Sequence, residues 1–368
     1  MLKTGIVIEK SKFVGVLPLS KVNLLELTPQ EIEGFFHSLG EPAYRKNQLL
    51  HWIWRRNVLE FDNMSNFSLQ LRQKLRKHAT MGSAEPVLRQ QSRDGTIKFL
   101  LALSDQHTVE TVILPYEIGD SVCLSTQVGC RMGCAFCASG LPGLIRNLTS
   151  GEIALQLLVA KRLLQEENRK LKSMVLMGTG EPLDNFDATV TFLEAVSDQE
   201  RLGMSLRHVT LSTCGLVPKI LELAKTGWPL NLAVSLHASN NELRNRIMPI
   251  NKKYPLEKLL VACDQYASLT GRRVTYEYIL IDGLNDEPRF AKELAGLLKG
   301  RLCHVNLIPF NAVSELNFRP SPQEKVKLFK NILTDAGVNV TVRRRLGDDI
   351  AAACGQLRNK YRGERNKG

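Results

Sequence analysis

The chain has 368 residues, of which 43% are hydrophobic, enough for a large α/β domain with a smaller companion. Its formal net charge of +12 favours a polyanionic partner, nucleic acid before an anionic membrane surface, although a merely basic protein would share that charge. No apolar run approaches the roughly 18 residues of a membrane helix, and the N-terminal "MLKTGIVIEKSKF" lacks the apolar stretch of a signal peptide, so we expect a soluble cytoplasmic protein.

Residues 1–85 are expected to form a small, mainly helical accessory domain. In "TPQEIEGFF", Thr28 is placed as the N-cap of a helix, Pro29 lies in its first turn and Glu31 closes a capping box. Apolar residues recur at helical spacing in "YRKNQLLHWIWRRNV" and "SLQLRQKLRKHA". The basic residues in these stretches are Arg45, Lys46, Arg55, Arg56, Arg72, Lys74, Arg76 and Lys77. They are either solvated helix faces or an RNA-binding surface, and the sequence favours neither.

Residues 86–118 are expected to form linker strands, with a hairpin around Asp94-Gly95 in "SRDGTIKFLLAL" and a strand in "TVETVILP". From residue 119 to residue 346, strands alternate with helices. The strands are "SVCLSTQ", "SMVLMGTG", "HVTLSTCG", "NLAVSLHA", "VTYEYILIDG", "HVNLIPFN" and "NVTVRRR". The helices include "SGEIALQLLVAKRLLQ", "LVPKILELAKT", "PLEKLLVACDQYA", "EPRFAKELAGLLKG" and "PQEKVKLFKNILTDAG". This alternation predicts a parallel sheet covered by helices.

Small or polar residues follow at least four of these strands, at Gly178–Glu181, Ser212, Ser235 and Asn311. In a (β/α) barrel such strand ends meet at one face, whereas a doubly wound sheet concentrates them at one switch point. The fold class predicted is therefore α/β, a partial (β/α) barrel with a small helical N-terminal domain. Residues 347–368 form a C-terminal segment with a basic tail.

Three of the eight cysteines lie in one loop, "GCRMGCAFCASG", as Cys130, Cys134 and Cys137. Glycines around them let the backbone curl, so that several thiolates can point at one centre. Structural zinc prefers four ligands in paired knuckles. A [4Fe-4S] cluster held by three cysteines keeps one iron open for an exogenous molecule. The alternatives are a zinc site completed by a distant Cys or His, and buried cysteines without a metal.

The cysteine spacing, with Phe136 just before the last cysteine, resembles the signature of the radical SAM enzymes. The resemblance implies that S-adenosylmethionine (SAM) chelates the open iron through its amino and carboxylate groups. "GTGEP" resembles the segment that receives the SAM amino group, with Gly180 and Glu181 at the matching positions. The remaining contacts to ribose and adenine would come from Ser212, Ser235, Leu236, His237 and Asn311.

Longer motifs narrow the resemblance to one family among the radical SAM enzymes. "VCLSTQVGCRMGCAFCASG", "GTGEPLDN", "VTLSTCGLVP", "SLHASNNELRNRIMPIN", "VNLIPFN" and "GDDIAAACGQL" occur in this order. Together they resemble the RlmN/Cfr family of rRNA adenine methyltransferases over nearly the whole chain. The resemblance implies methylation of an adenine carbon of 23S rRNA (adenosine 2503 in the family) and possibly of tRNA adenosine 37. "GTGEPL" looks more like the type that methylates C2, and the C8-methylating type is the alternative.

The same resemblance implies that Cys354 is methylated by a first SAM, its thiolate acting as the nucleophile. A second SAM, cleaved with an electron from the cluster, would give a radical that takes a hydrogen from the S-methyl group. The methylene radical would add to adenine and link protein to RNA. Cys123 would then attack the Cys354 sulfur, forming a transient disulfide, and Glu110 would accept a proton. Each of these three residues also has a structural interpretation, as core or as a strand charge.

The implied partners are RNA and a reductant such as flavodoxin or ferredoxin, and the chain is expected to be a monomer that does not bind membranes. Cys214, Cys263 and Cys303 are expected in the core. Thr179 and Cys214 depart from the family pattern beside SAM contacts. Two readings from other classes remain: a radical SAM activase or maturase acting on a protein, and a zinc-stabilised RNA-binding protein without catalytic activity.

Overall fold

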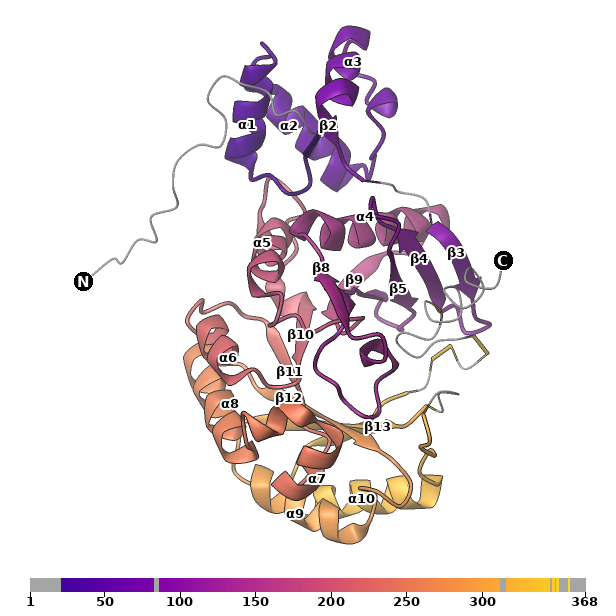
Figure 1. Ribbon diagram of the computed structural model, residues 1–368, viewed down its shortest axis with the longest axis vertical. Coiled ribbons are helices and arrows are strands. Elements are labelled where there is room, and N and C mark those ends of the chain that lie inside the picture. Colours follow the sequence, from indigo (N-terminus) through magenta and orange to yellow (C-terminus); the bar gives the residue numbers. More distant parts are fainter. Residues whose placement is uncertain are drawn as a thin grey trace, which may run out of the picture.

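The computed structural model describes residues 21–82, 86–311, 316–344, 346–347, 349–350 and 357 (Figure 1). The N-terminal module holds β1 (Val22–Asn23), α1 (Pro29–Ser38), α2 (Arg45–Leu50), the π-helix η1 (His51–Arg55), the 3-10 helix η2 (Phe61–Asn63), α3 (Leu69–His78) and β2 (Ala79–Thr80). The predicted capping box is confirmed: Thr28 accepts from the Glu31 amide, and Glu31 accepts from the Thr28 amide. Phe35, Phe36 and Trp54 form the centre of the module's core.

The main sheet has ten strands among the described residues, in the order β14-β13-β12-β11-β10-β9-β6-β5-β4-β3. Their bounds are β3 Pro86–Gln91, β4 Ile97–Ala102, β5 Thr108–Leu114, β6 Asp120–Cys123, β9 Leu171–Leu176, β10 Val209–Thr213, β11 Asn231–Ser235, β12 Val274–Leu280, β13 Cys303–Pro309 and β14 Val340–Val342. The seven strands from β6 to β14 are parallel. The predicted hairpin is confirmed, and β3, β4 and β5 extend the same sheet in antiparallel fashion.

Strand order distinguishes the two α/β architectures. Along the parallel part, each strand lies beside the one before it in the chain, without the reversal that defines a doubly wound sheet. β14 and β3 are the two edges of this sheet within the described ranges, so the barrel is open. The predicted partial (β/α) barrel is confirmed.

Helices cover one face of the parallel strands. They are α4 (Ser150–Glu166), α5 (Phe186–Ser197), α6 (Val217–Ala224), α7 (Asn241–Ile247), α8 (Leu256–Thr270), α9 (Pro288–Leu298) and α10 (Gln323–Asp335), with short 3-10 turns η3 (Ala138–Gly140), η4 (Leu206–His208) and η5 (Pro249–Lys252). The five helices named from the sequence are present, whereas α5 and α7 were not predicted. In the part of the chain that the structure describes, no helix combines the length and apolarity that crossing a membrane needs.

The N-terminal module lies against α4 and α5 (Figure 1). The Arg55 guanidinium donates to the carbonyls of Gln199 and Leu202, in the loop after α5. From α4, the Lys161 ammonium donates to the Trp54 carbonyl at 2.7 Å. Several basic residues that the sequence offered as an RNA surface therefore hold the protein together, and Arg55 is the clearest case.

Candidate active site

Sheet register places several predicted site residues on one face. Side chains alternate between faces along a strand, and directly paired residues of neighbouring strands share a face. Cys123 pairs with Val112 of β5 and with Val175 of β9, and Val112 lies two residues from Glu110. Applied strand by strand, the pairings put Glu110, Cys123, Ser212, Ser235 and Glu277 on the same face. This face, called the inner face below, is opposite the buried side of β9 that carries Met174 and Leu176.

A small hairpin not predicted from the sequence frames the cysteine loop. It consists of β7 (Gln127–Gly129) and β8 (Leu144–Asn147). Gly129 has φ +83°, and a Cβ there would lie 1.9 Å from the Gly143 carbonyl oxygen, so only glycine fits. The Cys130 amide donates to the same carbonyl at 3.0 Å. The two ends of the loop between these strands are thus joined, and the loop carries its three cysteines within one closed turn of the chain.

The three cysteines of the loop are partly buried. Burial raises the pKa of the Cys130 thiol to about 12 and also raises that of Cys134, and the neighbouring thiols of the loop raise both further. Among the described residues, no three His, Cys, Asp or Glu side chains could hold one metal ion together. A single zinc would need its thiolates about 2.3 Å from one point. In a [4Fe-4S] cube each cysteine binds a different iron, and three thiols carried by one loop are a donor set of that kind.

The "GTGEP" loop packs directly against the segment that leads into this hairpin. A Cβ at Gly178 would lie 2.7 Å from the Leu124 carbonyl oxygen. A Cβ at Gly180, where φ is +113°, would lie 2.8 Å from the Gln127 amide nitrogen. The two glycines are required by this close approach, which places Gly180 and Glu181 beside the cysteine loop.

Glu181 is buried, and its carboxylate accepts from the amides of Leu183 and Cys214 at 3.0 and 2.7 Å. Burial raises the pKa of this carboxyl above its usual value, while these hydrogen bonds oppose the rise. The carboxylate is therefore oriented by the backbone. A cationic amino group is the chemical partner that would offset the cost of its burial.

His237 follows β11 in the left-handed region, with φ +58°. Its Nδ1 accepts from the Ile279 amide at 3.0 Å, and its ring meets that of Phe136 edge to face at a centroid distance of 4.7 Å. Burial, together with the smaller effect of the Arg244 charge, lowers the pKa of His237 to about 3, so the imidazole is neutral. His237 thus connects the end of β11 to the residue before Cys137.

The remaining predicted contacts differ in exposure. Ser212 and Ser235 are half-buried on the inner face, and Asn311 is exposed beyond β13. Leu236 is fully buried; its amide donates to the Glu277 carbonyl, and its carbonyl accepts from Arg244. A contact from Leu236 to a nucleoside would therefore be apolar or through the backbone.

Sequence analysis missed Arg244, whose side chain is fully buried. Its guanidinium donates to the backbone carbonyls of Cys214, Ser235 and Leu236, and so joins the ends of β10 and β11. No local signal marks it, because its partners are backbone carbonyls at the ends of two other elements, β10 and β11. Arg131, in the cysteine loop, forms a bidentate pair with Asp184 at 2.8 Å and ties that loop to the residues after "GTGEP".

Cys354 lies outside the described residues. Shortly before it, the Gly347 amide donates to the Asp94 carboxylate at 2.7 Å, and Asp349 bonds to Ser92. Gly347 and Asp349 are therefore held at the turn between β3 and β4. Cys214, Cys263 and Cys303 are buried, as expected, and burial raises the pKa of Cys263 to about 12.

Comparison with known proteins agrees with this geometry. Residues 124–294 match the radical SAM superfamily, and residues 22–81 match the ribosomal RNA large subunit methyltransferase N-terminal domain. A solved radical SAM methyltransferase from Sphaerobacter thermophilus is 43% identical, with a TM-score of 0.89, over 91% of this chain and 98% of its own. The fold is that of a radical SAM methyltransferase, an enzyme that uses a [4Fe-4S] cluster and two SAM molecules per turnover.

Two relatives specify the family. The probable dual-specificity RNA methyltransferase RlmN of Desulforamulus reducens is 49% identical over 93% of this chain and 97% of its own length. The protein of the same name from Halalkalibacterium halodurans is 47% identical over 92% of this chain and 93% of its own length. The chain belongs to the RlmN family.

Proposed function

We propose that this enzyme methylates an adenine carbon of RNA, with C2 favoured, in 23S rRNA and at adenosine 37 of tRNA. One observation carries the proposal: the relatives named as dual-specificity RNA methyltransferases match over 92–93% of the chain, through the N-terminal module as well as the barrel. A radical SAM activase acting on a protein would not require a module similar to a ribosomal RNA methyltransferase domain.

In this proposal Cys130, Cys134 and Cys137 hold the cluster, which supplies the electron that cleaves SAM. The loop carrying Gly180 and Glu181 receives the SAM amino group, since the Glu181 carboxylate is buried, oriented and close to the cysteine loop. Ser212, Ser235, Leu236, His237 and Asn311 orient the nucleoside from the carboxyl ends of their strands.

Cys354 carries the methyl group, and Cys123 resolves the protein–RNA adduct through a transient disulfide. The shared inner face supports this assignment, because Cys123 lies opposite Val112, and Glu110 is the next residue of β5 on the same face. Glu110 is the proton acceptor and is paired with Lys98. The described residues that precede Cys354 lie at the turn between β3 and β4, two strands that belong to the same sheet as Cys123.

RNA binding is assigned to the exposed part of the basic surface. Lys77 and Arg56 are exposed on the N-terminal module, and Arg344 is exposed after β14. A target adenine in folded RNA must leave its stack to reach a buried site, so these charges would hold the flanking phosphates. A cytoplasmic location and a flavodoxin or ferredoxin as electron donor follow from the same proposal.

The test uses protein with a reconstituted cluster, SAM, dithionite, and transcripts of 23S rRNA or tRNA. Mass spectrometry of the nucleosides should show 2-methyladenosine. Cys354→Ala should abolish it, and Cys123→Ala should trap a covalent protein–RNA adduct. Detection of 8-methyladenosine would mean that the enzyme methylates C8 and not C2. SAM cleavage without any methylated nucleoside would overturn the proposal that RNA is the substrate. Methylation retained by Cys354→Ala would rule out the protein-bound methyl group.

A further inference from the structure

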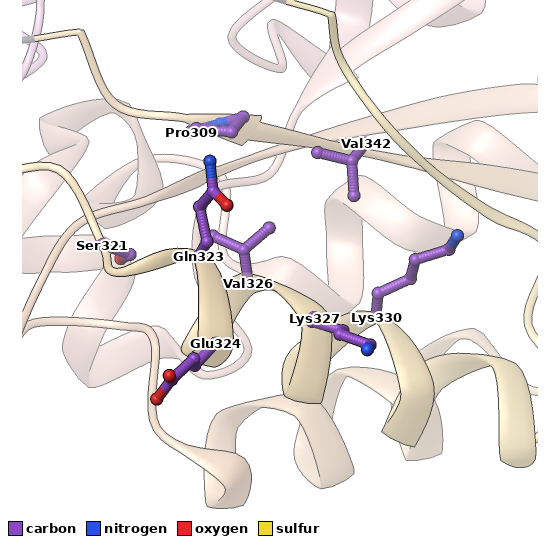
Figure 2. Close-up of a pocket in the computed structure, with 8 residues that line it drawn as sticks. All are labelled: Pro309, Ser321, Gln323, Glu324, Val326, Lys327, Lys330 and Val342. Carbon is purple, nitrogen blue, oxygen red and sulfur yellow. The ribbon is translucent and has the colours of Figure 1, made fainter.

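A pocket of about 650 Å³ lies outside the site described above, between α10 and the β13–β14 edge of the sheet (Figure 2). Its lining residues are Pro309, Ser321, Gln323, Glu324, Val326, Lys327, Lys330 and Val342. By register, Val342 pairs with Leu307, whereas Asn306 pairs with Glu277 of the inner face. The pocket therefore opens on the helix-covered side of the sheet, and it is called the α10 pocket below.

Two features make the α10 pocket a candidate binding site rather than a packing gap. Ser321 is only 6% exposed, yet its hydroxyl has no hydrogen-bond partner among the described residues. A buried hydroxyl without a partner is costly, and a bound polar group would relieve that cost. Val326 and Val342 also line the pocket and give it an apolar wall, and the amide of Gln323 points toward Pro309 (Figure 2).

The charge at the pocket is positive. Lys327 and Lys330 are exposed, and within the described ranges neither forms an ion pair with a carboxylate. Lys325, on the same helix, is instead paired with Asp282 at 2.7 Å. Glu324 points away from the strands, whereas Lys330 points toward Val342 (Figure 2). An apolar wall with hydrogen-bonding groups and two cations fits a nucleobase with its phosphate.

The edge strand β14 connects this pocket to the active site. Val342 lines the pocket, so its neighbour Arg343 faces the opposite, inner side of the sheet, where Glu277 lies. Burial raises the pKa of the Glu277 carboxyl, and the Arg343 charge opposes that rise. Because β14 is an open edge among the described strands, RNA leaving the inner face over its carboxyl end would reach the α10 pocket. The chain's own tail is a poor occupant, since residues 358–368 carry five Lys and Arg against one Glu.

We propose that the α10 pocket binds one nucleotide of the RNA strand beside the target adenine, an inference that rests on the proposed RNA substrate. The base lies against Val326 and Val342 and bonds to the Ser321 hydroxyl, and Lys327 and Lys330 hold the phosphate. The pocket thereby adds affinity and positions the strand, without taking part in the chemistry.

The experiment compares Lys327→Glu/Lys330→Glu with wild type and with a charge-matched control, Lys225→Glu/Lys258→Glu, whose lysines are exposed on other helices. Binding of a 23S rRNA or tRNA transcript is measured over a range of salt concentrations. The pocket variant should bind more weakly, with the slope of log K against log salt reduced by about one for each lysine. Methylation of Cys354 without RNA and iron content per chain should both be unchanged, which shows that the fold and the cluster are intact.

A second variant, Val342→Trp, fills the pocket without changing charge, and should raise KM for RNA while leaving kcat unchanged. A salt slope equal to that of wild type, or equal losses in the control, would overturn the subsite. Dithionite is the reductant in these assays, and each is repeated with a protein electron donor. A defect seen only with that donor would mean that the pocket binds the donor, which also overturns the subsite. If wild type fails to methylate RNA, the proposed function fails; if wild type succeeds and both pocket variants match it, only this inference fails.

Discussion

The Nζ atom of Lys98 lies 3.1 Å from Oε2 of Glu110, and the two side chains are 0% and 4% exposed. Lys98 of β4 lies opposite Val112 of β5, and Glu110 of β5 lies opposite Leu100 of β4, so the pair crosses diagonally between two antiparallel strands. A buried pair is expensive to break from one side, because the partner keeps its charge without compensation.

Lys98→Met is therefore expected to lower the free energy of unfolding by about 3–5 kcal/mol. The double variant Lys98→Met/Glu110→Gln should be more stable than the single one, since no uncompensated carboxylate remains. Urea unfolding followed by circular dichroism measures both. A single variant within about 1 kcal/mol of wild type would mean that Lys98 contributes little to holding Glu110.

Glu110→Gln tests the proton-acceptor role separately. General-base catalysis typically contributes about 10²–10⁴-fold to a rate, so methylated adenosine should fall by at least about 100-fold. Methylation of Cys354 should continue, because that step does not involve the RNA proton. Mass spectrometry of both the nucleosides and the intact protein reads the two steps. Equal losses at both steps would point to a structural role for Glu110.

Gly129→Ala should abolish cluster assembly, because the added Cβ would lie 1.9 Å from the Gly143 carbonyl oxygen. Gly140→Ala is the matched control in the same loop, since a Cβ there would meet its nearest atoms only at 4.0 Å. Iron and sulfide per chain after anaerobic reconstitution are the measurement. Full iron content in Gly129→Ala would show that the hairpin does not shape the site.

His237 predicts acid instability. Its pKa is lowered from 6.5 to about 3 in the folded protein, so the unfolded chain binds the extra proton between these values and stability falls as pH drops from 6.5 toward 3. The loss from this residue is at most about 1.4 kcal/mol per pH unit. His237→Asn, which keeps a hydrogen-bond acceptor for the Ile279 amide, should show a flatter stability profile over this range. Identical profiles would exclude His237 as a source of acid instability.

Arg55→Ala should loosen the N-terminal module, because the Arg55 guanidinium donates to two carbonyls of the loop after α5. Hydrogen exchange at residues 198–204 should become faster. Lys77→Ala is the control: Lys77 is exposed, so its loss should weaken RNA binding without changing exchange at this loop. Unchanged hydrogen exchange in Arg55→Ala would mean that Arg55 does not hold the module in place, and would favour a role for it in RNA binding.

Local sequence rules were sufficient where the interaction itself is local. The Thr28–Glu31 capping box spans one helical turn, and the cysteine triplet lies within one loop, so both could be predicted from spacing. The alternation of apolar strands with helices predicted the parallel sheet, and the small or polar residues after at least four strands predicted the partial barrel, whose strand order follows chain order.

The failures have the opposite cause. Arg244 looks like any helical arginine, and it is buried only because carbonyls from two strand ends converge on it. Arg55 resembles a surface cation until the loop after α5 is placed beside it. The β7–β8 hairpin has strands of three and four residues, too short for a recognisable alternation. Arg244 and Arg55 thus depend on contacts with other elements of the fold, and the hairpin on strands too short to show a pattern.

The strand order also bears on how the molecule is made. Apart from the β6–β9 pair, every strand of the main sheet joins the neighbour synthesised just before it, so the sheet can grow by accretion from β3 to β14 as the polypeptide leaves the ribosome. The bond from Gly347 to Asp94 spans 253 positions and has to wait for almost all of that growth. This bond, which precedes Cys354 by seven positions, thus forms only after the sheet that carries Cys123 and Glu110 has been laid down.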